Sequence, residues 1–187
     1  MDKFTINTGD TMVLFVDIQG KMLPAMADAD AVKRNSYVLL KAAELLGLPC
    51  LITEQYPKGL GPTIPELAGP LEKMGAAYSD KTAFNALTPT IKEALAQAPF
   101  AGRKNVVVCG IETHICVFQS VRTLLGLGYN VFIPVDAVSS REVRNKESAL
   151  SMFMQMGAVV SCTESLLFDL MEDSKNPHFK ELQALIK

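Results

Sequence analysis

The stretch from residue 104 to residue 119, KNVVVCGIETHICVFQ, constrains the fold more than any other part of the chain. Its β-branched residues Val106 to Val108 run into a Cys-Gly pair, and apolar residues at helical spacing follow from Ile115. A short apolar run, a glycine and a helical pattern in this order predict a strand, a tight turn and a helix. The pattern places Cys116 in the first turn of that helix.

Cys116 has two interpretations. The unpaired N–H groups and the dipole of a helix's first turn favour a thiolate over a thiol, which would make this cysteine a nucleophile. A free cysteine that follows a buried strand is, however, commonly a small core residue. The segment alone leaves both interpretations open.

Strand patterns alternate with helical patterns along the rest of the chain. Strands are expected at residues 12–17, 48–54, 78–81, 105–110, 129–135 and 158–162. Helices are expected at residues 31–46, 88–96, from 114 or 115 to 125, 144–156, from 163 or 165 to 170, and from 177 onward. Residues 55–67 are rich in glycine and proline and are expected to form a loop at the carboxyl end of a strand. The alternation predicts an α/β fold in which helices cover both faces of a parallel sheet.

Three residues with complementary chemistry follow expected strands. Asp17 ends the first strand, Lys81 ends the third, and Cys116 follows the fourth. In an open parallel sheet, ligands bind beyond the carboxyl ends of the strands. An acid that can take a proton, a cation that can hold an anion and a sulfur nucleophile form a workable set for covalent catalysis. Taken alone, a lysine is ordinarily a solvated surface residue, so the argument for Lys81 depends on its sequence context.

Four motifs supply that context and resemble the isochorismatase-like cysteine hydrolases. They are FVDIQGKM, LITEQYPKGLGPTIPEL, SDKTAFNAL and CGIETHICVFQS, in this order, from residue 15 to residue 120. Each is weak alone, but together they are specific, and the nearest subgroup is the metal-free one of isochorismatase-domain proteins. The resemblance implies a three-layer α/β/α, Rossmann-like fold with a six-stranded parallel sheet in the order 3-2-1-4-5-6. In that order Asp17 and Cys116 face the same crevice, and Lys81 reaches in from two strands further out.

The resemblance also implies a mechanism. In a Cys116-Asp17-Lys81 triad, Asp17 takes the thiol proton, Lys81 stabilises the anions, and the sulfur attacks a carbonyl carbon to form a thioester that water hydrolyses. The backbone N–H groups of Glu112 and Cys116 are implied as oxyanion donors, with a cis peptide bond between Ile111 and Glu112. We therefore expect a hydrolase, acting on C–N bonds other than peptide bonds in a small amide- or ester-like substrate whose identity the sequence does not give.

Differences in sequence from better-known members of the family restrict the expected activity and metal content. Nicotinamidases carry an aspartate and several histidines for a metal after the second strand, where this chain has Glu54-Gln55-Tyr56. We therefore expect no metal and no other cofactor, and nicotinamidase activity is disfavoured. Isochorismatase itself cleaves a vinyl ether and does not require the cysteine, so the presence of Cys116 favours acyl chemistry. The substrate-pocket candidates, for which loop packing is an equal alternative, are Gln19, Gln55, Tyr56, Phe84 and Thr113.

Composition bounds the class of protein. The chain of 187 residues is expected to form one domain, residues 1–187. A formal charge of −2 without a basic block gives no electrostatic footprint for nucleic acid or membrane, so the expected partner is a small-molecule substrate. The N-terminal region lacks the long apolar core of a signal peptide. We expect a cytoplasmic location, with an organelle such as the mitochondrion left open, and four reduced cysteines.

Two functional alternatives stay open. The fold could serve as a non-catalytic, homo-oligomeric interaction module, and some relatives are labelled ribonucleases, although the acidic balance gives little support for RNA binding. A homo-oligomer is expected in either case, because nearly half of the residues are apolar. The residues expected to include an interface are Met22, Leu23, Met26, Met152, Phe153, Met154, Met156 and Phe179.

Overall fold

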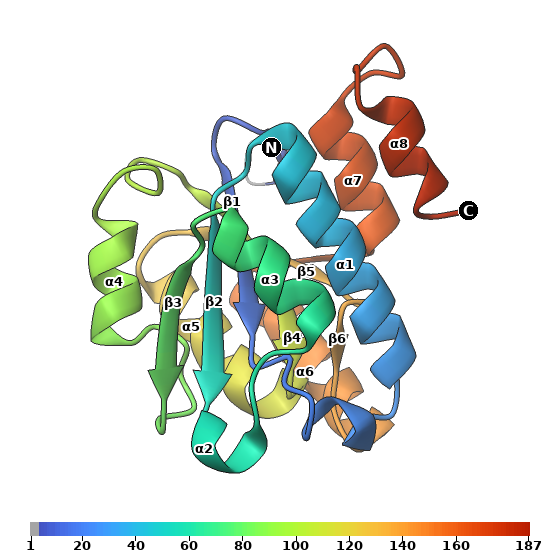
Figure 1. Ribbon diagram of the computed structural model, residues 1–187. Helices are drawn as coiled ribbons and strands as arrows, with labels where there is room; N and C mark the ends of the chain where they lie inside the picture. Colours follow the sequence, from blue (N-terminus) through green and yellow to red (C-terminus); the bar gives the residue numbers. More distant parts are fainter. Residues whose placement is uncertain (1–3) are drawn as a thin grey trace.

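The computed structural model describes residues 4–187. These residues fold around one sheet with the strand order β3-β2-β1-β4-β5-β7, and the short strand β6 pairs with β4 (Figure 1). Every strand pair in this sheet is parallel. The strands are β1 (Thr11–Val16), β2 (Cys50–Gln55), β3 (Ala77–Lys81), β4 (Asn105–Ile111), β5 (Asn130–Pro134), β6 (Val138–Ser139) and β7 (Val159–Ser161).

The central strands read as continuous apolar runs because helices cover both of their faces. Every residue of β1, β2 and β4 is buried. Alternate side chains enter opposite cores, so Val13 and Phe15 join one hydrophobic cluster while Met12 and Leu14 join the other.

Two helical layers sandwich the sheet. The helices are α1 (Ala29–Leu46), α2 (Pro57–Leu60), α3 (Pro65–Lys73), α4 (Pro89–Leu95), α5 (Phe118–Gly126), α6 (Val143–Met156), α7 (Thr163–Met171) and α8 (Phe179–Ala184), with a 3₁₀ turn η2 (Leu23–Ala25) and a π-helical turn η3 (Thr113–Val117). Side chains of α1, α3 and α7 pack on one face, and those of α4, α5 and α6 pack on the other. Figure 1 shows α1 and α3 in front of the sheet and α5 and α6 behind it. None of the helices within residues 4–187 is long and apolar enough to cross a membrane.

The expected fold class and strand order are confirmed, and all six expected strands are present. The two-residue strand β6 was not expected. The expectation of a loop over residues 55–67 is wrong, because this stretch contains α2 and the first residues of α3. Both helices carry proline in their first turn, at Pro57 and Pro65, where the missing N–H and the fixed φ favour helix initiation.

The apolar residues expected at an interface divide into three groups. Leu23, Met26 and Phe153 are buried within this chain and belong to its cores. Met152 and Met154 are exposed. The remaining three, Met22, Met156 and Phe179, are half-buried.

Candidate active site

Asp17 directly follows Val16, the last residue of β1. Its φ of 53° turns the chain out of the strand, and its N–H donates to the Thr53 carbonyl at 3.1 Å. The neighbouring strand β4 comes very close at this point, because a Cβ on Gly110 would lie 2.0 Å from the Val16 carbonyl oxygen. Only glycine fits there, at a φ of 127° that other residues avoid. The ends of β1 and β4 therefore bring Asp17 next to the turn that carries Cys116.

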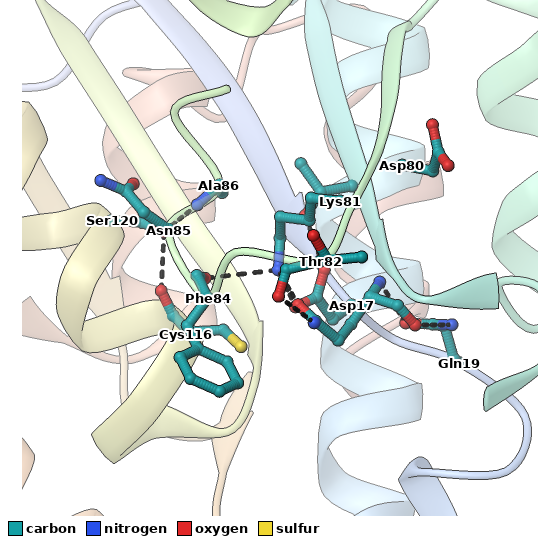
Figure 2. A network of polar contacts seen from close by, with 12 residues as sticks. Asp17, Gln19, Asp80, Lys81, Thr82, Phe84, Asn85, Ala86, Cys116 and Ser120 are labelled. Carbon is teal, nitrogen blue, oxygen red and sulfur yellow. Dashed lines mark hydrogen bonds and ion pairs between the residues drawn. The ribbon is translucent and has the colours of Figure 1, made fainter. Parts of the chain in front are cut away.

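Lys81, the last residue of β3, is buried and fully hydrogen-bonded. Its Nζ donates to Asp17 Oδ2 at 2.6 Å, to Gln55 Oε1 at 2.7 Å and to the Phe84 carbonyl at 3.3 Å (Figure 2). These contacts use all the donors of an ammonium group. Thr53 Oγ1 donates to Asp17 Oδ1 at 2.8 Å, so both oxygens of the buried carboxylate accept hydrogen bonds. The side chains of this ion pair are almost completely shielded from solvent.

Cys116 lies beside this ion pair, within η3 rather than in the first turn of a regular α-helix. Figure 2 shows its sulfur pointing toward the side on which Asp17 and Lys81 lie. The side chain is nearly enclosed, with the residue only 3% exposed. The structure thus brings together the three residues that follow β1, β3 and β4.

The pKa of Cys116 is raised, whereas a position at the start of a helix would by itself lower it. Burial, followed by the charge of Asp17 and a side-chain hydrogen bond with it, raises the pKa of this thiol to about 12. Lys81 lowers the pKa of Cys116 but does not outweigh those effects. Burial therefore outweighs the preference for a thiolate that a helix start alone would give, because the cysteine is desolvated and the lysine charge is already paired with Asp17. The raised pKa favours the thiol form of Cys116 at neutral pH.

The backbone around Cys116 has an unusual geometry. The Ile111–Glu112 peptide bond is cis. Ile115 N–H and Val117 N–H both donate to the Glu112 carbonyl, at 3.0 and 3.2 Å. The Glu112 carbonyl is therefore held at the start of the turn that carries Cys116.

Residues after β6 hold this turn from the outside. The Glu112 carboxylate accepts hydrogen bonds from Arg141 N at 3.0 Å and from Arg141 Nε at 3.1 Å. His114 Nδ1 and Ser140 Oγ lie 2.9 Å apart. Ser140 and Arg141, directly after β6, therefore anchor the segment that carries the two expected oxyanion donors.

Ser120 joins the Cys116 turn to the loop that follows β3. Its hydroxyl donates to the Cys116 carbonyl at 2.6 Å and accepts from the Ala86 N–H at 2.8 Å (Figure 2). The Phe84 carbonyl that contacts Lys81 belongs to the same loop. One buried serine thus fixes the position of the nucleophile relative to the lysine side of the site.

The five pocket candidates take different places. Tyr56 and Phe84 are 53% and 52% exposed and lie at the surface beside the site. Gln55 is buried against Lys81. Gln19 is fully buried. Its Nε2 donates to the carbonyls of Gln55 and Gly61, and its Oε1 accepts from the Gln55 N–H, so this amide connects the segment after β1 to the end of β2 and to the segment after α2.

Thr113 is also fully buried, and its hydroxyl has no hydrogen-bond partner among the described residues.

A cavity of about 600 Å³ lies beside the edge strand β3. Tyr56 is among the residues that line it, but Asp17 and Cys116 are not.

Sequence reasoning missed Thr53 and Ser120. Both had a usable signal, since Thr53 alternates with Gln55 on one face of β2 and Ser120 follows Cys116 by one helical turn.

Comparison with known families gives one match that covers most of the chain. Residues 11–165 match the model of the isochorismatase domain. A relative from Xenopus laevis, isochorismatase domain-containing protein 2, is 41% identical over 176 residues, which cover 93% of this chain and 82% of that protein.

Two solved structures share the fold over nearly the whole chain. The MAR1 ribonuclease from Caenorhabditis elegans is 36% identical with a TM-score of 0.88, over 97% of this chain and 92% of that one. The YcaC gene product from Escherichia coli, described as an octameric hydrolase of unknown specificity, is 25% identical with a TM-score of 0.85, over 97% of this chain and 94% of that one.

Proposed function

The chain belongs to the isochorismatase domain family, a family of isochorismatase-like hydrolases, and on that premise we propose that it is a cysteine hydrolase of small amide- or ester-like substrates. The observation that carries the proposal is the enclosed thiol of Cys116 beside a buried Asp17–Lys81 ion pair. A nucleophile next to a base that a third group orients is the arrangement that covalent catalysis requires.

Acylation begins with the Cys116 thiol. Its proton passes to the Asp17 carboxylate while the sulfur bonds to the carbonyl carbon and the C=O π electrons move to oxygen. Asp17 can accept this proton although both of its oxygens are engaged, because each carboxylate oxygen has two lone pairs and accepts one bond from Thr53 or Lys81. The raised pKa of Cys116 suits a proton transfer that is coupled to attack rather than one that precedes it.

The tetrahedral oxyanion needs donors that are already in place. We propose the backbone N–H groups of Glu112 and Cys116 for this role. When the intermediate collapses, the carbon–nitrogen or carbon–oxygen bond breaks, and the leaving amine or alcohol takes the proton held by Asp17. Water then attacks the Cys116 thioester with Asp17 as its base, which releases the acid and restores the thiol.

The enclosure of Cys116 favours a small substrate. A side chain on a residue that is 3% exposed can be reached only by a compact acyl group, or after Phe84 and Tyr56 at the surface move aside. C–N bonds outside peptide linkages fit this limit, because a polypeptide could not enter a site of this kind.

RNA cleavage is the second candidate, because the Caenorhabditis elegans relative is named a ribonuclease. The formal charge of −2 and the enclosed thiol favour the small-molecule substrate. We also propose that the protein is a homo-oligomer, as the Escherichia coli relative is described to be.

Trapping of the acyl group tests the proposal directly. A panel of small amides, carbamates and activated esters should give hydrolysis by the wild type, and intact mass spectrometry of quenched reactions should show one added acyl group. Cys116→Ala should lose the adduct and at least about 1,000-fold of the rate, since removal of a nucleophile typically costs at least that much. Cys162→Ala is the matched control, because Cys162 is half-buried and lies in no contact with Asp17 or Lys81 among the described residues.

A full rate in Cys116→Ala, or an adduct on Cys162, would contradict the mechanism. Release of oligonucleotides from single-stranded RNA by the wild type, without turnover of any small substrate, would favour the ribonuclease instead.

A further inference from the structure

The β2 strand presents a second polar group on the face that points away from the candidate active site. Thr53 and Gln55 contact Asp17 and Lys81, and the alternation of side chains along a strand turns Glu54 to the opposite face. That face is covered by α3, which lies in front of β2 in Figure 1.

The Glu54 carboxylate is buried, and no ion pair within residues 4–187 involves it. The residue is 8% exposed, and its carboxylate accepts hydrogen bonds from Thr63 N–H at 2.6 Å and from the Tyr78 hydroxyl at 3.0 Å. Since a carboxylate has about four acceptor positions, two neutral donors leave both capacity and charge unmatched.

A cavity of about 360 Å³ opens onto this carboxylate. Its walls are mostly apolar, with polar groups at Glu54, Thr63, Tyr78 and the exposed Glu72. Thr63 is 3% exposed, and its hydroxyl has no partner among the described residues. A cavity of this size with few convergent polar groups has the character of a small-ligand site.

We propose that this cavity, the Glu54 cavity, is a second binding site that takes a small organic ammonium compound. The ammonium group would bind the Glu54 carboxylate and the Thr63 hydroxyl, and its carbon chain would lie against Ile52, Ala68 and Leu71. A primary ammonium offers three donors, which match the unused acceptor positions.

An organic cation fits the Glu54 cavity better than a metal ion does. No group of three or more His, Cys, Asp or Glu side chains that could hold a metal is found in residues 4–187, and the mostly apolar walls of the cavity suit a carbon chain. The neighbouring phenol also stays neutral, because burial and the hydrogen bond to Glu54 raise the pKa of Tyr78 to about 12. The charge of the site therefore remains that of its carboxylates.

A matched pair of probes tests the charge requirement in the intact wild-type protein. n-Pentylammonium chloride and 1-pentanol have the same chain length and differ in the charged head group. At neutral pH and constant ionic strength, calorimetric titration should give a dissociation constant for pentylammonium at least tenfold below that for pentanol. Amide chemical shifts of Thr63 and Tyr78 should move with the same saturation curve.

Three variants locate the site. Glu54→Gln should abolish the preference for the ammonium probe. Thr63→Val should fold at least as well as the wild type, because the hydroxyl has no partner to lose, and should weaken pentylammonium binding several-fold. Glu66→Gln is the control, because Glu66 lies on the same helix α3 but is exposed and paired with Lys33.

Equal binding of the two probes would show that the Glu54 carboxylate does not select a cation, and an absence of saturable pentylammonium binding would show that the Glu54 cavity takes no such ligand. Either result would overturn the proposal. An ammonium preference that survives in Thr63→Val and Glu54→Gln would place the site elsewhere and overturn it as well. If Glu54→Gln does not fold, the probe pair and Thr63→Val decide. The readout is binding, so it does not depend on hydrolysis at Cys116.

Discussion

The Lys81 ammonium has every N–H engaged inside the protein, with the Asp17 carboxylate, the Gln55 amide and the Phe84 carbonyl. Such completeness is what a buried ion pair requires, because the desolvation of two charges otherwise exceeds their attraction. Replacement of a buried pair by apolar residues is often neutral or stabilising, whereas removal of one partner costs about 3–5 kcal/mol. A buried pair is therefore weak evidence for a stabilising role, and its place beside Cys116 is better explained by the chemistry of the site.

Burial of thiols predicts a loss of stability at high pH. Burial raises the pKa of Cys50 from 9.0 to about 12, so between these values the folded state holds a proton that the unfolded state has released. Stability then falls as pH rises through this range, by up to about 1.4 kcal/mol per pH unit for each such thiol. Cys50→Ala should show a shallower decline in unfolding free energy between pH 8.5 and about pH 10.5 in urea titrations. Parallel curves for the variant and the wild type would contradict this explanation.

The residues of the candidate site differ in how far the sequence could predict them. Asp17, Lys81 and Cys116 each follow a strand, and the ends of parallel strands meet at one edge of the sheet. The role of Thr53 depends on the β1–β2 register, in which it is opposite Val16, and a shift by one residue would turn its hydroxyl away. The protonated state of Cys116 depends on tertiary burial, which the local helix pattern does not contain.

At the scale of elements, the long and strongly patterned segments could be predicted and the short ones could not. Five of the six expected strands follow from runs of apolar residues, and the strand at residues 78–81 was expected from a short segment that is mostly polar. The strand β6 has only two residues and is held by its pairing to β4. The π-helical turn η3 looks like the start of α5 in sequence, because only its hydrogen bonds distinguish the two.

The junction between β1 and β4 should not tolerate a side chain at Gly110. In Gly110→Ala the new methyl group would lie 2.0 Å from the Val16 carbonyl oxygen at a φ of 127°, so the strand ends must separate. We expect a loss of at least about 3 kcal/mol in unfolding free energy, or failure to fold. Gly126→Ala, in helix α5 with no atom within 4 Å of the added carbon, should instead be neutral or stabilising by about 0.5–1 kcal/mol. Similar unfolding midpoints for both variants in urea would show that the junction can relax.

The connection between η3 and the loop after β3 should depend on Ser120. In Ser120→Ala the buried Ala86 N–H loses its acceptor, at a cost of about 1–3 kcal/mol. The position of Cys116 relative to Lys81 should loosen as well, so kcat should fall about tenfold or more with little change in KM. Ser151→Ala, at an exposed position of α6, is the control and should change neither quantity. An unchanged kcat in a destabilised Ser120→Ala would restrict the role of the serine to folding.

At the scale of the whole molecule, most of the apolar side chains pack into three hydrophobic clusters, and α6 carries several of the large apolar residues that remain exposed. Val143 and Met154 are 50% and 58% exposed. At 100° per residue they lie on the same side of α6, with the half-buried Leu150 between them. Single exposed apolar residues need no explanation, but a stripe along one helix is typical of an interface.

This stripe leads to the prediction for assembly. Light scattering across a wide concentration range should give a mass that is a multiple of 20.3 kDa for the wild type. Met154→Glu should lower that mass, because an interface core does not accept an unpaired carboxylate. Tyr37→Glu is the control, since Tyr37 is an exposed aromatic residue on α1, in the opposite helical layer, and its replacement should leave the mass unchanged. A mass near 20.3 kDa at every concentration would show that the α6 stripe stays in water and that the protein is a monomer.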